Sequence, residues 1–124
     1  MLTRQEYTDA VADILKRVFP AAKIERDIAI GNQMPIDMLI RHDKERVAII
    51  TKFLVAGRPM IHPGDFDRTV DYLYAIPIPA ILIWGGDGWP QHVVKYFNKS
   101  PICAEYQYNK SADAFQTILD LCIL

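Results

Sequence analysis

The sequence predicts one α/β domain, in which a mixed β-sheet carries helices on its faces. Two observations predict this class: apolar residues recur at helical spacing in some segments, and short strand-like runs lie between those segments. Three strand-like runs come one after another, which favours a meander, and a later run follows a helical segment, which favours a crossover. The chain has 124 residues, so we expect a single domain over residues 1–124.

The first predicted element is an amphipathic helix that begins after Thr3. Residues 3–6 read Thr-Arg-Gln-Glu, the form of a capping box in which Thr3 and Glu6 satisfy each other's backbone amides. The helix is expected to end before Pro20, because a proline disfavours helical geometry at the residue that precedes it. The apolar stripe of this helix comprises Tyr7, Val11, Ile14, Leu15 and Val18.

Three strand-like segments follow this helix, at residues 23–30, 36–40 and 47–53. The third segment is rich in β-branched residues, which favour strands. The polar stretch at residues 42–45 is short enough for a hairpin turn between the second and third segments. We therefore expect these strands to form a meander.

The second half of the chain alternates between helices and strands. It completes the predicted order α-β-β-β-α-β-α-β-α. The predicted elements are a helix from near Asp65 to Pro77, a buried strand at residues 81–84, a helix at residues 91–99, a strand at residues 102–108 and a closing helix capped by Ser111.

Composition narrows the class of protein further. Apolar residues make up 51% of the chain, which is enough for a sizeable core. The formal net charge is −1, so no global positive field recruits nucleic acid, although a local basic stripe is compatible with that charge. The N-terminus lacks the apolar run of a signal peptide, and no apolar run is long enough to span a bilayer. Cys103 and Cys122 form no CxxC pattern, so we expect a cytoplasmic protein with no membrane partner.

Two short motifs lie on the second and third strands of the predicted meander. Pro35-Ile36-Asp37 opens the second strand, and Ile50-Thr51-Lys52 lies near the end of the third. With the order α-β-β-β-α-β over about the first two-thirds of the chain, they resemble the PD-(D/E)XK nuclease superfamily. That family carries an aspartate at the start of the second strand and an acid-x-lysine on the third. The resemblance implies a restriction endonuclease-like mixed sheet flanked by helices.

The resemblance also implies a Mg²⁺-dependent DNA endonuclease, with Asp37 as the metal ligand and Lys52 as catalytic base or charge stabiliser. Such a hydrolase uses the metal to neutralise developing charge and to activate a water. Because side chains alternate along a strand, we expect Lys52 to share the site face with Asp37, while Thr51 points away and offers only its carbonyl. An ion pair between Lys52 and Asp37 would account for both residues without any metal.

The chain departs from the family pattern at Ile50, which stands where the second acid belongs. Two interpretations remain open. In the first, another acid supplies the missing carboxylate and the site still binds Mg²⁺. In the second, the site is inactive and the fold serves DNA binding or protein interaction, as a homodimer. The replacement acids considered are Glu6, Asp27, Asp67 and Asp71.

Basic residues cluster modestly around the predicted hairpin. Arg41, Lys44 and Arg46 lie on the hairpin, and Arg58 lies in the following loop. If they face the Asp37 side, they are candidates for contacts to nucleic-acid phosphates, whose affinity is electrostatic. The alternative is a solvated hairpin tip whose charges discourage edge-to-edge aggregation.

Overall fold

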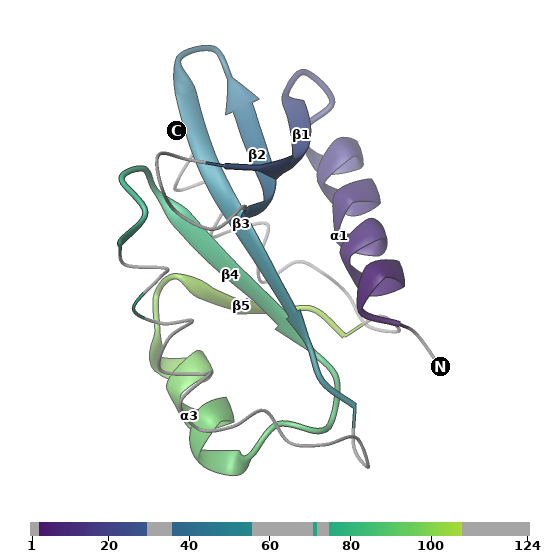
Figure 1. Ribbon diagram of the computed structural model, residues 1–124, viewed down its shortest axis with the longest axis vertical. Coiled ribbons are helices and arrows are strands. Elements are labelled where there is room, and N and C mark those ends of the chain that lie inside the picture. The colour runs from purple at the N-terminus through teal and green to yellow at the C-terminus, as the bar shows by residue number, and fades with distance from the viewer. Residues whose placement is uncertain (1–2, 30–35, 56–70, 72–74, 108–124) are drawn as a thin grey trace.

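The computed structural model describes residues 3–29, 36–55, 71 and 75–107, which form a five-stranded mixed sheet with helices on both faces (Figure 1). The sheet order is β1-β2-β3-β4-β5, with antiparallel pairing from β1 to β3 and parallel pairing from β3 to β5. This arrangement confirms the predicted fold class. The elements are α1 (Arg4–Val18), β1 (Lys23–Ile28), β2 (Ile36–His42), β3 (Glu45–Phe53), β4 (Ala80–Gly85), α3 (Gln91–Lys99) and β5 (Cys103–Glu105).

The two described helices lie on opposite faces of the sheet (Figure 1). The face beneath α1, here called the α1 face, buries one apolar cluster, and the face beneath α3, the α3 face, buries another. Successive residues of β3 and β4 belong to alternate clusters, as the pleat of a strand requires. The central strands are apolar because both of their faces are covered.

Helix α1 begins where the capping box predicts. The Thr3 side chain accepts a hydrogen bond from the Glu6 amide at 3.1 Å, and the Glu6 carboxylate accepts one from the Thr3 amide at 3.1 Å. These bonds satisfy amides that the first helical turn leaves unpaired. The helix ends at Val18, and Phe19 before Pro20 has left helical geometry.

The other described elements follow the predicted order with shifted ends. The helix at residues 91–99 matches its prediction, whereas the last strand is shorter than the predicted 102–108. Asp43 turns the β2–β3 hairpin with a φ of 55°, which an aspartate adopts more readily than most residues. The helix expected from near Asp65 and the helix expected after Ser111 fall mostly or wholly outside the described residues. Among the helices that are described, none has the length and apolarity to span a membrane.

Candidate functional site

Along β1 and β2, the apolar side chains switch from one face of the sheet to the other at the same level. In β1, Ile24 packs in the α1-face cluster, whereas Ile28 packs in the α3-face cluster. In β2, Met38 belongs to the α1 face and Ile36 to the α3 face. Strict alternation would keep both members of each pair on one face. The regular pleat is therefore interrupted between these residues in both strands.

The interruption is centred on two aspartates. Asp27 has a φ of 53°, in the left-handed region that short polar side chains tolerate. The pairs Arg26↔Met38 and Ile28↔Ile36 flank Asp27 and Asp37, which places these two residues at the same level of neighbouring strands. Both aspartates line one cleft of about 400 Å³ beside the start of α1, here called the polar cleft. The described residues that line it are Arg4, Gln5, Thr8, Arg26, Asp27 and Asp37.

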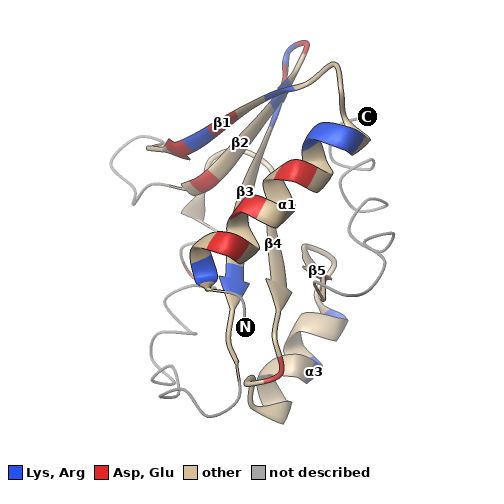
Figure 2. Ribbon diagram, turned by 90° about the vertical axis from the view of Figure 1, so that its right-hand side faces the viewer, with Lys and Arg blue, Asp and Glu red and all other residues tan. Residues whose placement is uncertain are grey.

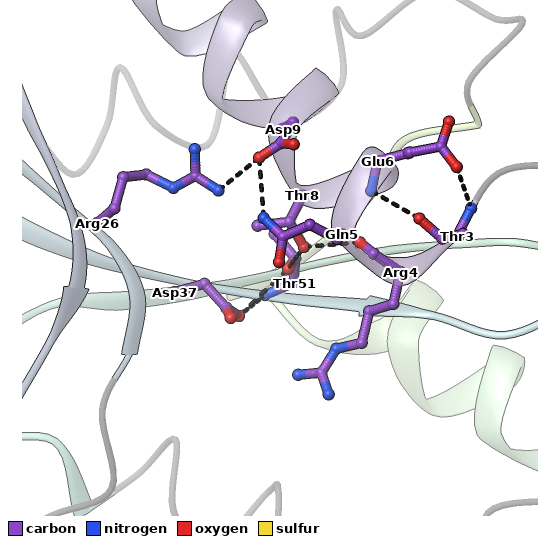
Figure 3. Close-up of polar contacts among 9 residues, drawn as sticks. All are labelled: Thr3, Arg4, Gln5, Glu6, Thr8, Asp9, Arg26, Asp37 and Thr51. Atoms are coloured by element: carbon purple, nitrogen blue, oxygen red, sulfur yellow. Dashed lines mark hydrogen bonds and ion pairs between the residues drawn. The ribbon is translucent and has the colours of Figure 1, made fainter.

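The Asp37 carboxylate is bonded to Thr51 on the neighbouring strand (Figure 3). Its Oδ2 atom accepts a hydrogen bond from the Thr51 amide at 2.7 Å and from the Thr51 hydroxyl at 3.2 Å. The β2–β3 register runs only as far as Met38↔Ile49, so the Thr51 amide lies beyond it. The carboxylate thus pairs a buried amide that the ladder does not reach, as buried backbone donors require.

A second threonine extends this arrangement to the helix. The hydroxyl oxygens of Thr8 and Thr51 lie 2.8 Å apart, and the Thr8 hydroxyl also reaches the Arg4 carbonyl at 3.0 Å (Figure 3). Each hydroxyl has one proton, and the Asp37 carboxylate and the Arg4 carbonyl only accept. The two protons are therefore shared among three contacts: from Thr8 to the Arg4 carbonyl, between Thr8 and Thr51, and from Thr51 to Asp37. The linked set of Thr8, Thr51 and Asp37 is here called the hydroxyl chain.

The expectation that Thr51 points away from Asp37 is wrong. The Thr51 side chain lies on the α1 face between Ile49 and Phe53, and both its amide and its hydroxyl contact Asp37. The cause is the interrupted pleat of β2, which carries Asp37 to the α1 side. By alternation along β3, the half-buried Lys52 leaves the sheet on the other face. A catalytic role for Lys52 remains a prediction.

The structure separates the four candidate replacement acids. Asp27 lines the polar cleft with Asp37. Glu6 is held in the capping box, whose hydrogen bonds from Thr3 hold the pKa of its carboxyl below the usual value. Asp71 is an exposed helical residue, and Asp67 lies outside the described residues. Over residues 3–29, 36–55, 71 and 75–107, no group of three or more acids, histidines or cysteines is arranged to hold a metal ion.

Two arginines also line the polar cleft, and the sequence interpretation missed both. Arg26 Nη2 bonds Asp9 Oδ1 at 2.8 Å, and this bond, with one from Gln5, holds the pKa of the Asp9 carboxyl below its usual range (Figure 3). The Nε atom of Arg26 is buried and has no hydrogen-bond partner among the residues that the structure describes. Arg4 stands one helical turn before Thr8, and this spacing was the available sign that both face one site.

The basic residues of the hairpin lie at the other end of β2. Lys23 is paired with Arg41 and Arg41 with Arg46, so that these three residues, here called the basic row, cross β1, β2 and β3 in register. Their neighbours Ile40 and Val47 face α1, which puts the basic row on the other face. Arg41 Nε bonds Glu25 at 2.7 Å. Figure 2 shows the charged residues at this end of the sheet.

The basic row is separate from the polar cleft. Arg41 is four positions after Asp37 on β2, a distance of about 13 Å along a strand. Lys44 is exposed in the hairpin turn, and Arg58 lies outside the described residues. Contacts to phosphates at the Asp37 site were expected only if the basic residues faced the Asp37 side. Arg41 and Arg46 lie on the other face of the sheet, so they do not meet this condition.

No family model matches this chain, and no curated protein matches it in sequence. Among solved structures, it is similar to SfsA of Pyrococcus furiosus in complex with Ca²⁺, with a TM-score of 0.48 and 16% identity over 94% of this chain and 49% of SfsA. A protein of unknown function, AF1548, is similar with a TM-score of 0.46 and 14% identity over 92% of this chain and 66% of that protein. The chain thus spans about half the length of SfsA. These likenesses concern the course of the backbone alone.

Proposed function

We propose that this chain is a non-hydrolysing binding module built on a nuclease-like fold. The observation that carries this proposal is the commitment of Asp37 to Thr51, with one carboxylate oxygen accepting two hydrogen bonds. The α1-side positions around that contact hold Ile49, Thr51 and Phe53, which offer neither a second acid nor a lysine. Phosphodiester hydrolysis of the metal-dependent kind needs such groups to bind the metal and activate water.

The partner proposed for this module is nucleic acid, bound through the basic row. Cations directly opposite on neighbouring strands repel each other, and an anion laid across them relieves the repulsion. Glu25 contacts two members, at 2.7 Å to Arg41 and 3.9 Å to Lys23, and leaves a net positive charge on the row. Strands lie about 4.8 Å apart, so the row extends over about 10 Å, a length suited to a phosphate backbone.

Fluorescence anisotropy with labelled single- and double-stranded DNA tests this proposal. We expect binding that weakens with salt, and we expect Arg46→Glu to weaken it further and to lower the salt slope by about 0.9 per lost duplex phosphate contact. Lys95→Glu, on the exposed side of α3, makes the same charge change elsewhere and serves as the control. Equal loss in both variants, or no binding by the unmodified protein, would sink the proposal.

The homodimer expected from the sequence is part of the same proposal, because two copies would present two basic rows to one nucleic acid. Linked binding sites gain affinity when both can engage at once. Sedimentation equilibrium measures the mass in solution directly. A protein that stays monomeric at all concentrations would remove the dimer from the proposal.

A Mg²⁺-dependent DNA endonuclease is the second candidate, and the placement of Asp27 favours it. Mg²⁺ is commonly held by one or two carboxylates with waters and substrate phosphate, and Asp27 and Asp37 line the same cleft. Plasmid cleavage with Mg²⁺ or Mn²⁺ should then be lost in Asp37→Ala and in Asp27→Asn, and kept in the control Asp13→Asn. Cleavage that is lost in the two cleft variants and kept in the control would replace the non-hydrolysing proposal. Absence of cleavage with both metals would support the non-hydrolysing proposal.

A further inference from the structure

The polar cleft has a balanced set of charges. Its described lining contains two guanidinium groups and two carboxylates, and the remaining lining side chains, Gln5 and Thr8, are also polar. A volume of about 400 Å³ falls within the range of small-molecule sites. Most such sites are largely apolar, so a lining in which every side chain carries a polar group indicates a small and strongly polar occupant.

Several of these polar groups have no partner among the described residues. Arg4 and Asp27 make no side-chain hydrogen bond or ion pair there. The buried Nε of Arg26 lacks an acceptor, although its Nη2 is bonded to Asp9. Asp37 uses only Oδ2 for Thr51. An unpaired buried donor is unfavourable, and an acceptor atom of a ligand at this position would pair it.

The uncommitted groups include both donors and acceptors. An anion alone would face the carboxylates of Asp27 and Asp37, and a cation alone would face the guanidiniums of Arg4 and Arg26. Figure 3 shows Asp37 between the side chains of Arg26 and Arg4. At the start of α1 the capping box engages the amides of Thr3 and Glu6, and the charged donors that line the cleft are the side chains of Arg4 and Arg26.

We infer that the polar cleft binds a small zwitterion, of the class of the free α-amino acids. The ligand carboxylate is bound by Arg4, whose planar guanidinium matches a carboxylate in a bidentate pair. The ligand ammonium lies between Asp27 and the free oxygen of Asp37. This site is separate from the basic row, and the inference does not depend on nucleic-acid binding.

Amide chemical shifts measured by two-dimensional NMR test the inference. Each of the twenty standard L-amino acids is added at millimolar concentration, with acetate and methylammonium as ligands that carry one charge each. We expect at least one amino acid to shift the amides of Arg26 and Thr51, and both single-charge ligands to bind at least tenfold more weakly. If no amino acid shifts these amides, the inference is wrong.

Two matched pairs of variants locate the site. Arg4→Gln and Asp27→Asn each remove one charge from the cleft and should weaken the best amino acid at least tenfold. Arg17→Gln and Asp13→Asn remove the same charges from exposed positions of α1 and should leave the affinity unchanged. Equal affinity of all four variants for the amino acid would show that it binds outside the polar cleft. Displacement of the amino acid by Mg²⁺ at lower concentration would assign the cleft to a metal ion and overturn the inference.

Discussion

The two faces of the sheet are packed in different ways. Rings pack on rings on both faces: the centroids of Trp84 and Phe97 lie 4.8 Å apart on the α3 face, and those of Tyr7 and Phe53 lie 4.7 Å apart on the α1 face. On the α1 face, apolar packing is combined with polar bonds. The buried polar side chains found in the described part of the chain, Thr8 and Thr51, both belong to this face.

The polar bonds of the α1 face restrict the position of its helix more closely than apolar packing does. Apolar contacts are non-directional, so a helix held by them alone tolerates small displacements. Hydrogen bonds between buried groups require particular distances and angles. Tyr7 Oη donates to the Tyr106 carbonyl at 2.9 Å, and Thr8 bonds Thr51, so α1 is anchored to β3 and to the residue that follows β5. The polar cleft lies on the face where the helix position is fixed.

Phe97→Ala should have the largest effect on the free energy of unfolding. Phe97 is buried between two tryptophans, and truncating a buried phenylalanine typically destabilises a protein by about 4 kcal/mol. Urea denaturation measures the loss, and Val94→Ala, at a half-buried position of the same helix, is the milder control. If packing on the α3 face is as non-directional as proposed, amides of the polar cleft should keep their chemical shifts. Large shifts there would show that the faces are coupled.

Asp37→Ala should destabilise the protein by about 3 kcal/mol, because the buried Thr51 amide loses its charged acceptor. Asp37→Asn keeps an acceptor oxygen and should recover part of that loss. Asp13→Ala, on the exposed side of α1, should change the free energy of unfolding by less than about 0.5 kcal/mol. A small effect of Asp37→Ala would mean that Thr51 does not depend on this carboxylate.

The hydroxyl chain should be detected as coupling between its two threonines. We expect Thr51→Val to destabilise the protein by about 1.5 kcal/mol, because the Thr8 hydroxyl and the Asp37 carboxylate each lose one of their partners. The double variant Thr8→Val with Thr51→Val should lose less than the sum of the single variants, by about 1 kcal/mol. Additive losses would contradict a direct bond between the two hydroxyls.

Tyr7→Phe should have the smallest effect near neutral pH, about 1 kcal/mol for the lost bond to the Tyr106 carbonyl. Burial raises the pKa of the Tyr7 phenol in the folded protein. A raised folded pKa means that the contribution of Tyr7 is fully present below the unfolded value of about 10 and is lost as pH rises towards the folded value. The free-energy difference between the unmodified protein and Tyr7→Phe should therefore shrink above about pH 10. A constant difference would contradict this assignment.

Much of the fold was predictable because its signals are local. The capping box of Thr3 and Glu6 marked the start of α1, and apolar spacing marked α3 at its observed bounds. The order of the strands followed from the short polar stretch around Asp43 and from the helical segments between later strands. The last predicted strand was longer than β5, because the apolar sequence pattern does not by itself determine where pairing ends.

The site was less predictable because it depends on a local irregularity and on tertiary packing. Period-two alternation placed Thr51 away from Asp37, and it failed because the pleat of β2 is interrupted next to Asp27. An aspartate is enriched at positive φ, but many aspartates have ordinary geometry, so the residue type alone gives no such prediction. Arg4 and Thr8 reach the same cleft only because α1 packs across β3.

The polar bonds of the α1 face also imply an order of assembly. Asp37 and Thr51 are 14 residues apart in the chain, Thr8 and Thr51 are 43 apart, and Tyr7 and Tyr106 are 99 apart. Closing a loop costs more entropy as the loop lengthens, and contacts distant in sequence form slowly. The Asp37–Thr51 bond should therefore form with the hairpin, and the helix should attach afterwards. The Tyr7–Tyr106 bond, which joins the first helix to the end of the last strand, would then report that folding is complete.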